Sequence, residues 1–175
     1  MEIKTIRIFI QNFKFFIKLS FFSILLGILS LGVLLPVFQA GFGYIFSRME
    51  KGESVYYKNI FKFLNKTFIL LGLWAILLIT FAATMIGIFL PVFVVAFFIY
   101  SPFILANEET GIFSSLRRSC EIVFKNGVFR HLAIAIILII IFLVGLVPFG
   151  LGIFVTFPVI SGYIGMMYER YKDVQ

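Results

Sequence analysis

Charge is scarce in this chain and absent from most of its length. Only 13% of the 175 residues are charged, and residues 19–47, 67–107 and 132–168 contain no Asp, Glu, Lys, Arg or His. Ion-coupled transporters usually keep an ionisable side chain at membrane depth, and many ion channels line their pores with charged rings. The uncharged stretches therefore argue against both mechanisms.

Nucleophilic and metal-binding side chains are equally rare. The chain has one cysteine, Cys120, and one histidine, His131. A single cysteine excludes an internal disulfide, and no CxxC or HExxH pattern is present. Because covalent catalysis needs a nucleophile beside a general base, no hydrolase or transferase site can be assembled. We therefore expect no enzymatic activity, no cofactor and no metal site.

The residues that are present are mostly apolar. Hydrophobic residues make up 62% of the chain, well above the roughly half that is usual for globular proteins, and this predicts an all-α integral membrane protein. A transmembrane helix needs about 20 apolar residues, so uncharged stretches of this length predict pairs of helices. We expect six transmembrane helices arranged as three hairpins. The first stretch is the shortest, and a shallow re-entrant hairpin is its alternative reading.

Each uncharged stretch contains a proline that could mark the tip of its hairpin. Proline cannot continue an ascending helix but suits the first turn of the next one. Each stretch also follows a short amphipathic segment that ends in an asparagine. The pattern predicts a threefold internal repeat within one membrane domain, residues 1–175, with units near 1–50, 51–109 and 110–175. The predicted tips are Pro36, Pro91 and Pro158.

All charged segments fall on one side of the membrane in this topology. Their excess of lysine and arginine marks that side as cytoplasmic, so both termini are expected there. The amphipathic segments should lie in the headgroup region, and the segment 110–126 has the clearest pattern. Its expected apolar stripe is Ile112, Phe113, Leu116, Cys120, Val123 and Phe124.

Basic side chains of these segments form a predicted collar at the cytoplasmic rim. Each lysine or arginine near a membrane surface attracts anionic lipid by about 1 kcal/mol. Anionic lipids are therefore the expected partner, together with another membrane protein or a second copy of the chain, whereas nucleic acid is not expected. The predicted headgroup contacts are Lys4, Arg7, Lys14, Lys18, Lys58, Lys62, Lys66, Arg117, Arg118, Lys125 and Arg130.

Small and polar residues inside the uncharged stretches indicate packing and a second functional hypothesis. Ala40, Gly41 and Gly43, like Gly162 and Gly165, predict close helix contacts. Gln39 is expected to make an interhelical hydrogen bond. If the protein is instead a transporter, the polar residues expected to line a cavity are Gln39, Thr84 and Thr156.

The C-terminal part of the chain also resembles a known group of proteins. Residues 101–107, 115–119, 125–126, 152–159 and 168–171 carry the resemblance, which covers about residues 95 to 172. They look like the membrane domain attached to some glycerophosphodiester phosphodiesterases and like its stand-alone prokaryotic relatives. The resemblance implies six helices, a prokaryotic inner-membrane location and a non-catalytic role. No phosphodiesterase catalytic domain is present here, so that activity is not implied.

Two functional hypotheses follow. The first is a non-enzymatic membrane scaffold, partner-binding subunit or regulator that contacts anionic lipid at its cytoplasmic rim. The alternative is a transporter or channel subunit for a lipid or small apolar solute. Transport predicts a continuous cavity lined by the polar residues named above, whereas a scaffold predicts a packed bundle without that cavity.

Overall fold

The computed structural model describes residues 3–84, 90–108, 110–146 and 152–172, and every regular element within them is helical. The elements are α1 (Ile3–Gln11), α2 (Phe13–Leu29), α3 (Leu35–Glu50), the 3₁₀ helices η1 (Tyr57–Phe61) and η2 (Leu64–Lys66), α4 (Thr67–Thr84), α5 (Leu90–Phe98), α6 (Ser101–Asn107), α7 (Ile112–Asn126), α8 (Val128–Leu146) and α9 (Ile153–Tyr171).

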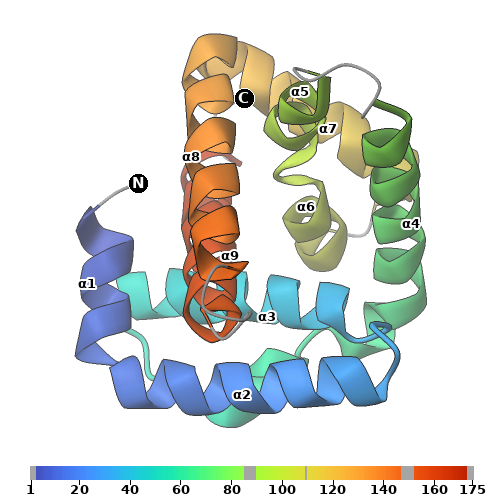
Figure 1. Cartoon of the computed structure of the whole chain (residues 1–175). Coiled ribbons are helices and arrows are strands. Elements are labelled where there is room, and N and C mark those ends of the chain that lie inside the picture. Colours follow the sequence, from blue (N-terminus) through green and yellow to red (C-terminus); the bar gives the residue numbers. More distant parts are fainter. Residues whose placement is uncertain (1–2, 85–89, 109, 147–151, 173–175) are drawn as a thin grey trace.

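Two helical segments are long and apolar enough to cross a membrane among the described residues. They are Tyr57–Thr80, which includes most of α4, and Val128–Leu146, which is α8. A third span is possible if α1 and α2, bent by 88° at Asn12, count as one. Figure 1 shows α2 and α3 running across the directions of α4 and α8. These four helices are therefore not parallel members of one bundle, and the six-span arrangement stays a prediction.

The three predicted proline tips have different outcomes. Pro36 lies in the first turn of α3, as predicted. Pro91 is the second described residue of α5, and the tip residues 87–89 before it lie outside the described residues. The prediction for Pro158 is wrong, because this proline lies inside α9. That helix begins five residues earlier, where the Gly152 carbonyl accepts hydrogen bonds from the backbone N–H groups of Val155 and Thr156.

The apolar segment that follows Pro91 is broken into two helices. Helix α5 ends at Phe98, and α6 begins at Ser101 with Pro102 in its first turn. A proline cannot donate the hydrogen bond that would join the two helices. The hydroxyl of Ser119 in α7 donates to the Phe97 carbonyl at 2.7 Å and accepts from the Tyr100 N–H at 3.3 Å. A side chain of another helix thus satisfies backbone groups at the break.

Helices α3 and α9 form the centre of the fold. The α3 residues from Pro36 to Ser47 are buried apart from Gln39 and Tyr44, and α9 is buried from Pro158 to Tyr168 apart from Ile160. One cluster of buried residues joins these two helices to α1, α2 and η1, a second joins α9 to α5–α8, and a third joins α3 to α4 and α6. The remaining helices therefore surround a central pair.

Large apolar side chains also cover much of the outer surface. On α2 the exposed residues include Phe21, Leu25 and Ile28, and on α8 they include Ile140 and Leu143. Soluble monomers rarely expose continuous apolar surface on this scale. These outer faces are compatible with contact to lipid.

Candidate functional site

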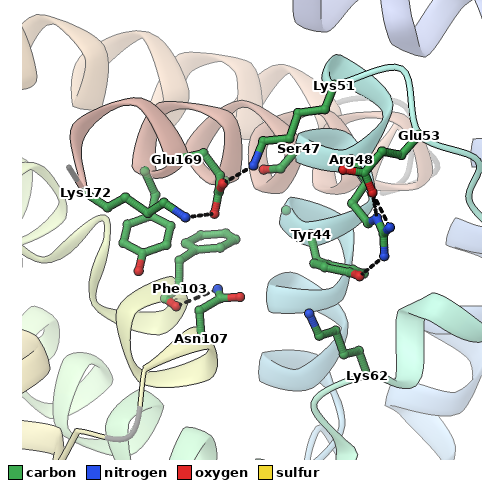
Figure 2. Close-up of a pocket in the computed structure, with 13 residues that line it drawn as sticks. Tyr44, Ser47, Arg48, Lys51, Glu53, Lys62, Phe103, Asn107, Glu169 and Lys172 are labelled. Atoms are coloured by element: carbon green, nitrogen blue, oxygen red, sulfur yellow. Dashed lines mark hydrogen bonds and ion pairs between the residues drawn. The ribbon is translucent and has the colours of Figure 1, made fainter.

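A polar cavity of about 400 Å³ lies beside the contact between α3 and α9 (Figure 2). The C-terminal ends of α3, α6 and α9 and the connection from α3 to η2 supply its walls. The lining residues are Gly43, Tyr44, Ser47, Arg48, Lys51, Glu53, Lys62, Phe103, Asn107, Gly165, Tyr168, Glu169 and Lys172.

Two glycines bring the walls of this cavity together. A Cβ atom added to Gly165 would lie 2.4 Å from the Cα atom of Gly43, and one added to Gly43 would lie 2.0 Å from the ring of Phe103. Such distances are far below van der Waals contact, so a side chain at Gly165 would push the two backbones apart and one at Gly43 would displace the Phe103 ring. This confirms the predicted close contact at these glycines and explains why side chains flanking them on α3 and α9 converge.

Glu169 is held between two lysines at one side of the cavity. Its Oε2 atom lies 2.6 Å from Lys51 Nζ and its Oε1 atom 3.1 Å from Lys172 Nζ (Figure 2). Burial by itself would raise the pKa of this carboxyl. The hydrogen bonds from the two lysines outweigh that effect and hold the pKa of Glu169 below its ordinary value. Glu169 is therefore a carboxylate at neutral pH.

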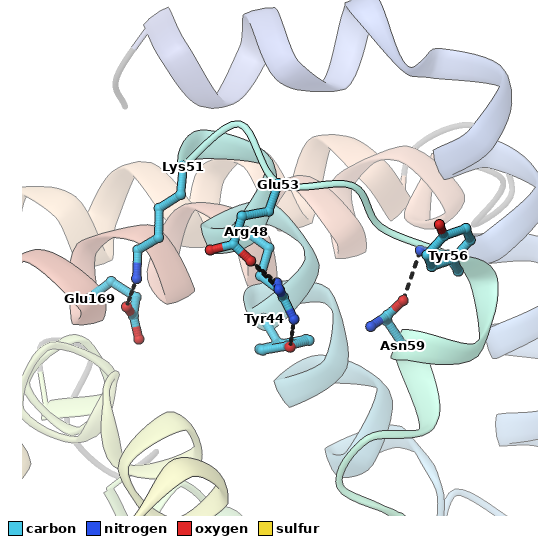
Figure 3. Close-up of polar contacts among 7 residues, drawn as sticks. All are labelled: Tyr44, Arg48, Lys51, Glu53, Tyr56, Asn59 and Glu169. Carbon is cyan, nitrogen blue, oxygen red and sulfur yellow. Dashed lines mark hydrogen bonds and ion pairs between the residues drawn. The ribbon is translucent and has the colours of Figure 1, made fainter.

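Arg48 and Lys62 flank Tyr44 at another side of the cavity. Arg48 forms an ion pair with Glu53 and donates from Nη1 to the Tyr44 hydroxyl at 2.5 Å (Figure 3). The Nζ atom of Lys62 lies 3.5 Å from the centroid of the Tyr44 ring, a cation–π distance. Within the described part of the chain, no carboxylate lies within ion-pair distance of Lys62.

The cavity walls therefore carry excess positive charge. Four lining side chains are cations, namely Arg48, Lys51, Lys62 and Lys172, and two are carboxylates, Glu53 and Glu169. The formal sum, four minus two, is +2. Such a cavity is suited to binding an anion.

A second polar centre adjoins the cavity through Tyr168. Its hydroxyl donates to Glu108 Oε1 at 2.8 Å, and Arg118 Nη1 lies 2.7 Å from Glu108 Oε2. Lys66 Nζ donates to the carbonyl oxygens of Leu105 and Glu108 at 3.2 and 2.9 Å. This centre fixes the end of α6 against η2, α7 and α9.

The predicted headgroup residues differ in what they contact. Lys66 and Arg118 are half-buried in the second polar centre, and Lys62 lines the cavity. Lys4 is exposed and lies 3.8 Å from Glu50. The headgroup assignment itself stays a prediction. The other seven predicted contacts are exposed: Arg7, Lys14, Lys18, Lys58, Arg117, Lys125 and Arg130.

Gln39 and Thr156, two of the three polar residues predicted to line a transport cavity, do not line the cavity described above. Gln39 Oε1 accepts a hydrogen bond from Trp74 Nε1 at 2.9 Å, which confirms the expected interhelical bond between α3 and α4. The buried hydroxyl of Thr156 has no hydrogen-bond partner among the described residues. The side chain of Thr84 lies outside the described residues.

Sequence reasoning did not single out most residues of the site. It assigned the segment 47–66 to the cytoplasmic side, but no motif distinguished Arg48, Lys51 or Glu53 from ordinary rim charges. It also gave no structural role to His131, whereas this side chain is 1% exposed and its Nε2 lies 2.9 Å from the Tyr100 hydroxyl. Its Nδ1 lies 2.9 Å from the Gly127 carbonyl oxygen. Spatial pairing of this kind leaves no local signal in a sequence.

Two further observations bear on the chemistry of the site. In the part of the chain that the structure describes, no group of three or more His, Cys, Asp and Glu side chains could hold a metal ion. Comparison of the chain with protein-family models, curated proteins and solved structures finds no match. The resemblance to the phosphodiesterase-associated membrane domain stays a prediction.

Proposed function

We propose that this chain is a non-enzymatic integral membrane protein whose charged segments lie together at the cytoplasmic face and hold anionic lipid. In this proposal the three uncharged stretches enter the membrane from that face as hairpins. The protein then acts as a scaffold or partner-binding subunit in the inner membrane.

The observation that carries this proposal is the contact between charged segments far apart in the sequence. Glu50 pairs with Arg170 at 2.5 Å and lies 3.8 Å from Lys4. The four charged segments are residues 1–18, 47–66, 107–131 and 169–175, and the pair Lys51–Glu169 joins the second of them to the fourth. The second polar centre joins Glu108 and Arg118 of the third segment to Lys66 of the second and to Tyr168, which directly precedes the fourth. Charges from all four segments thus meet, as expected if they share one side of a membrane.

The packing of α3 and α9 supports the repeat within this proposal. Pro36 and Pro158 each precede a glycine by seven residues, namely Gly43 and Gly165. These two glycines, which occupy matching positions of the first and third units, are the pair whose backbones meet. Contact between matching positions is typical of two units related by an approximate twofold axis.

The lipid preference can be tested with exposed collar residues that lie outside the cavity. The full chain would be reconstituted in nanodiscs of phosphatidylcholine and phosphatidylglycerol, and lipid retained by the released protein would be measured by native mass spectrometry. We expect enrichment of phosphatidylglycerol, and loss of that enrichment when Lys14, Lys18, Arg117 and Lys125 are all replaced by glutamine. The matched control is Lys62→Gln, which changes the cavity and leaves these four residues intact.

Equal retention of the two lipids by the wild-type protein would contradict the proposal. A flux assay with the same protein in liposomes separates the scaffold from the transport alternative. We expect no protein-dependent flux of lipid or small apolar solute, and specific flux would favour the alternative.

A further inference from the structure

We propose that the cavity beside the α3–α9 contact is a binding site for a phosphomonoester group. This inference rests on the proposed function, because it requires the cavity to open at the face where anionic groups are met. It goes further by naming a defined site and a class of ligand.

Charge is the first reason. The cavity walls sum to +2, and both carboxylates among them are already paired with lining cations, Glu53 with Arg48 and Glu169 with Lys51 and Lys172. A phosphomonoester carries a charge of about −1.5 to −2 at pH 7, which matches this excess. A phosphodiester or a carboxylate carries only one negative charge and would leave the cavity positive.

The placement of the cations is the second reason. Figure 2 shows Lys62 and Lys172 approaching the cavity from opposite sides, with Lys51 and Arg48 along the α3 wall. The ammonium group of Lys62 lies over an aromatic ring. No carboxylate among the described residues forms an ion pair with it. A lysine that is not committed to a carboxylate can donate to a phosphate oxygen without first breaking an ion pair. The structure therefore assigns Lys62 the leading role in holding the ligand.

The neutral lining is the third reason. The hydroxyl of Ser47 and the amide of Asn107 line the cavity together with the rings of Phe103 and Tyr168. A volume of about 400 Å³ is within the usual range of small-molecule sites, roughly 300–1,000 Å³. A phosphate would fill a small part of it, and the aromatic walls would contact the organic group that bears the phosphate.

Two sources supply this chemistry, a lipid with a phosphomonoester headgroup and a soluble phosphate. The experiment uses the full chain in phosphatidylcholine nanodiscs, with phosphatidic acid in the disc as one probe and inorganic phosphate in solution as the other. Binding would be measured as a rise in unfolding temperature and by titration calorimetry. Binding of phosphatidic acid alone identifies the lipid source, and binding of inorganic phosphate identifies the soluble one.

Variants link the binding to the cavity. Lys62→Gln should weaken binding about tenfold or more, as expected when a hydrogen bond to a charged group is lost. Lys62→Arg keeps the charge and should restore most of the affinity. Lys58→Gln is the matched control, because Lys58 is exposed and does not line the cavity, and it should bind like the wild type. Unchanged unfolding temperatures without ligand would show that the three variants fold.

The proposal is overturned if neither probe binds, or if Lys58→Gln and Lys62→Gln weaken binding equally. These outcomes are distinct from failure of the proposed function. A protein that enriches phosphatidylglycerol but binds neither probe has the anionic rim without the phosphate site. A protein that binds a probe through Lys62 but retains both bulk lipids equally has the site without the rim preference.

Discussion

Replacing Gly165 by alanine tests how the central helix pair holds the site together. The added Cβ atom would lie 2.4, 2.7 and 2.8 Å from the Cα, C and O atoms of Gly43. Ordinary contact begins near 3.4 Å, and all three atoms belong to backbone, so no side chain can move aside. The two helices would have to separate by about 1 Å at this point.

The cost can be set against the gain in helix propensity. Overpacking of a close-packed core costs about 1–3 kcal/mol, whereas alanine is favoured over glycine inside a helix by about 1 kcal/mol. The free energy of unfolding of Gly165→Ala should therefore fall by up to about 2 kcal/mol. Separation of the helices should also change the cavity and weaken phosphate binding.

Gly72 in α4 provides the matched control. Among the described residues, a Cβ atom there would meet only the Cδ1 atom of Ile112, the far end of a flexible side chain, at 3.3 Å. Gly72→Ala should therefore be neutral or slightly stabilising, because the helix-propensity gain remains. Both variants would be compared by denaturant or thermal unfolding in the same detergent. If Gly165→Ala is as stable as Gly72→Ala, the close approach of α3 and α9 is wrong.

Three further changes test separate contacts. Because lysine hydrogen bonds lower the pKa of Glu169, its contribution to stability is present at neutral pH and is lost as the pH falls through the folded-state pKa, below the ordinary carboxyl range. The difference in unfolding temperature between the wild type and Glu169→Gln should therefore shrink on acidification, and a pH-independent difference would contradict this. Tyr100→Phe removes the partner of buried His131 Nε2 and should cost about 1–3 kcal/mol in chemical unfolding, whereas an unchanged midpoint would refute the buried pair. Gln39→Leu removes the acceptor of the indole N–H of Trp74, the only tryptophan, and should shift its fluorescence to shorter wavelength, with no shift expected if the bond is absent.

Parts of the fold could be predicted because local chemistry determines them. Residue type and spacing predicted the proline at the start of α3, a helix within residues 110–126 and close packing at Gly43 and Gly165, although not that these two glycines meet each other. Each depends on a backbone property: a missing N–H group, a helical period or the absence of a Cβ atom. Such properties act within one or two turns of a helix and leave a local pattern.

The buried face of α7 could not be predicted in the same way. Phe113 and Phe124 of the expected apolar stripe are 80% and 65% exposed, whereas Ser115 and Ser119 are buried. In a protein surrounded by lipid, hydrophobicity does not separate an outer face from a core face, and small residues pack well between helices. Both buried serine hydroxyls donate to backbone carbonyls. The apolar stripe therefore included residues on the outer surface as well as residues inside.

The candidate site depends on pairings between distant segments. The sequence placed the charged segments on one side, but the contacts of Glu169 with Lys51 and of Glu108 with Arg118 and Tyr168 depend on how helices cross. The misplaced tip at Pro158 has a similar origin, because the start of α9 depends on the Gly152 turn rather than on the proline. Residue types predicted basic side chains at one face, and tertiary packing determined which of them line a cavity.

The sidedness of the chain tests the central claim most directly. Cysteines would be introduced singly in a Cys120→Ser background, at Leu31 in the turn between α2 and α3 and at Ser54 in the charged segment after α3. Both positions are exposed. Labelling with a membrane-impermeant maleimide would be compared in intact cells and in inverted membranes. The account predicts that Ser54→Cys reacts only from the cytoplasmic side and Leu31→Cys only from the opposite side. Reaction of Ser54→Cys from outside would contradict it, as would reaction of both positions from the same side.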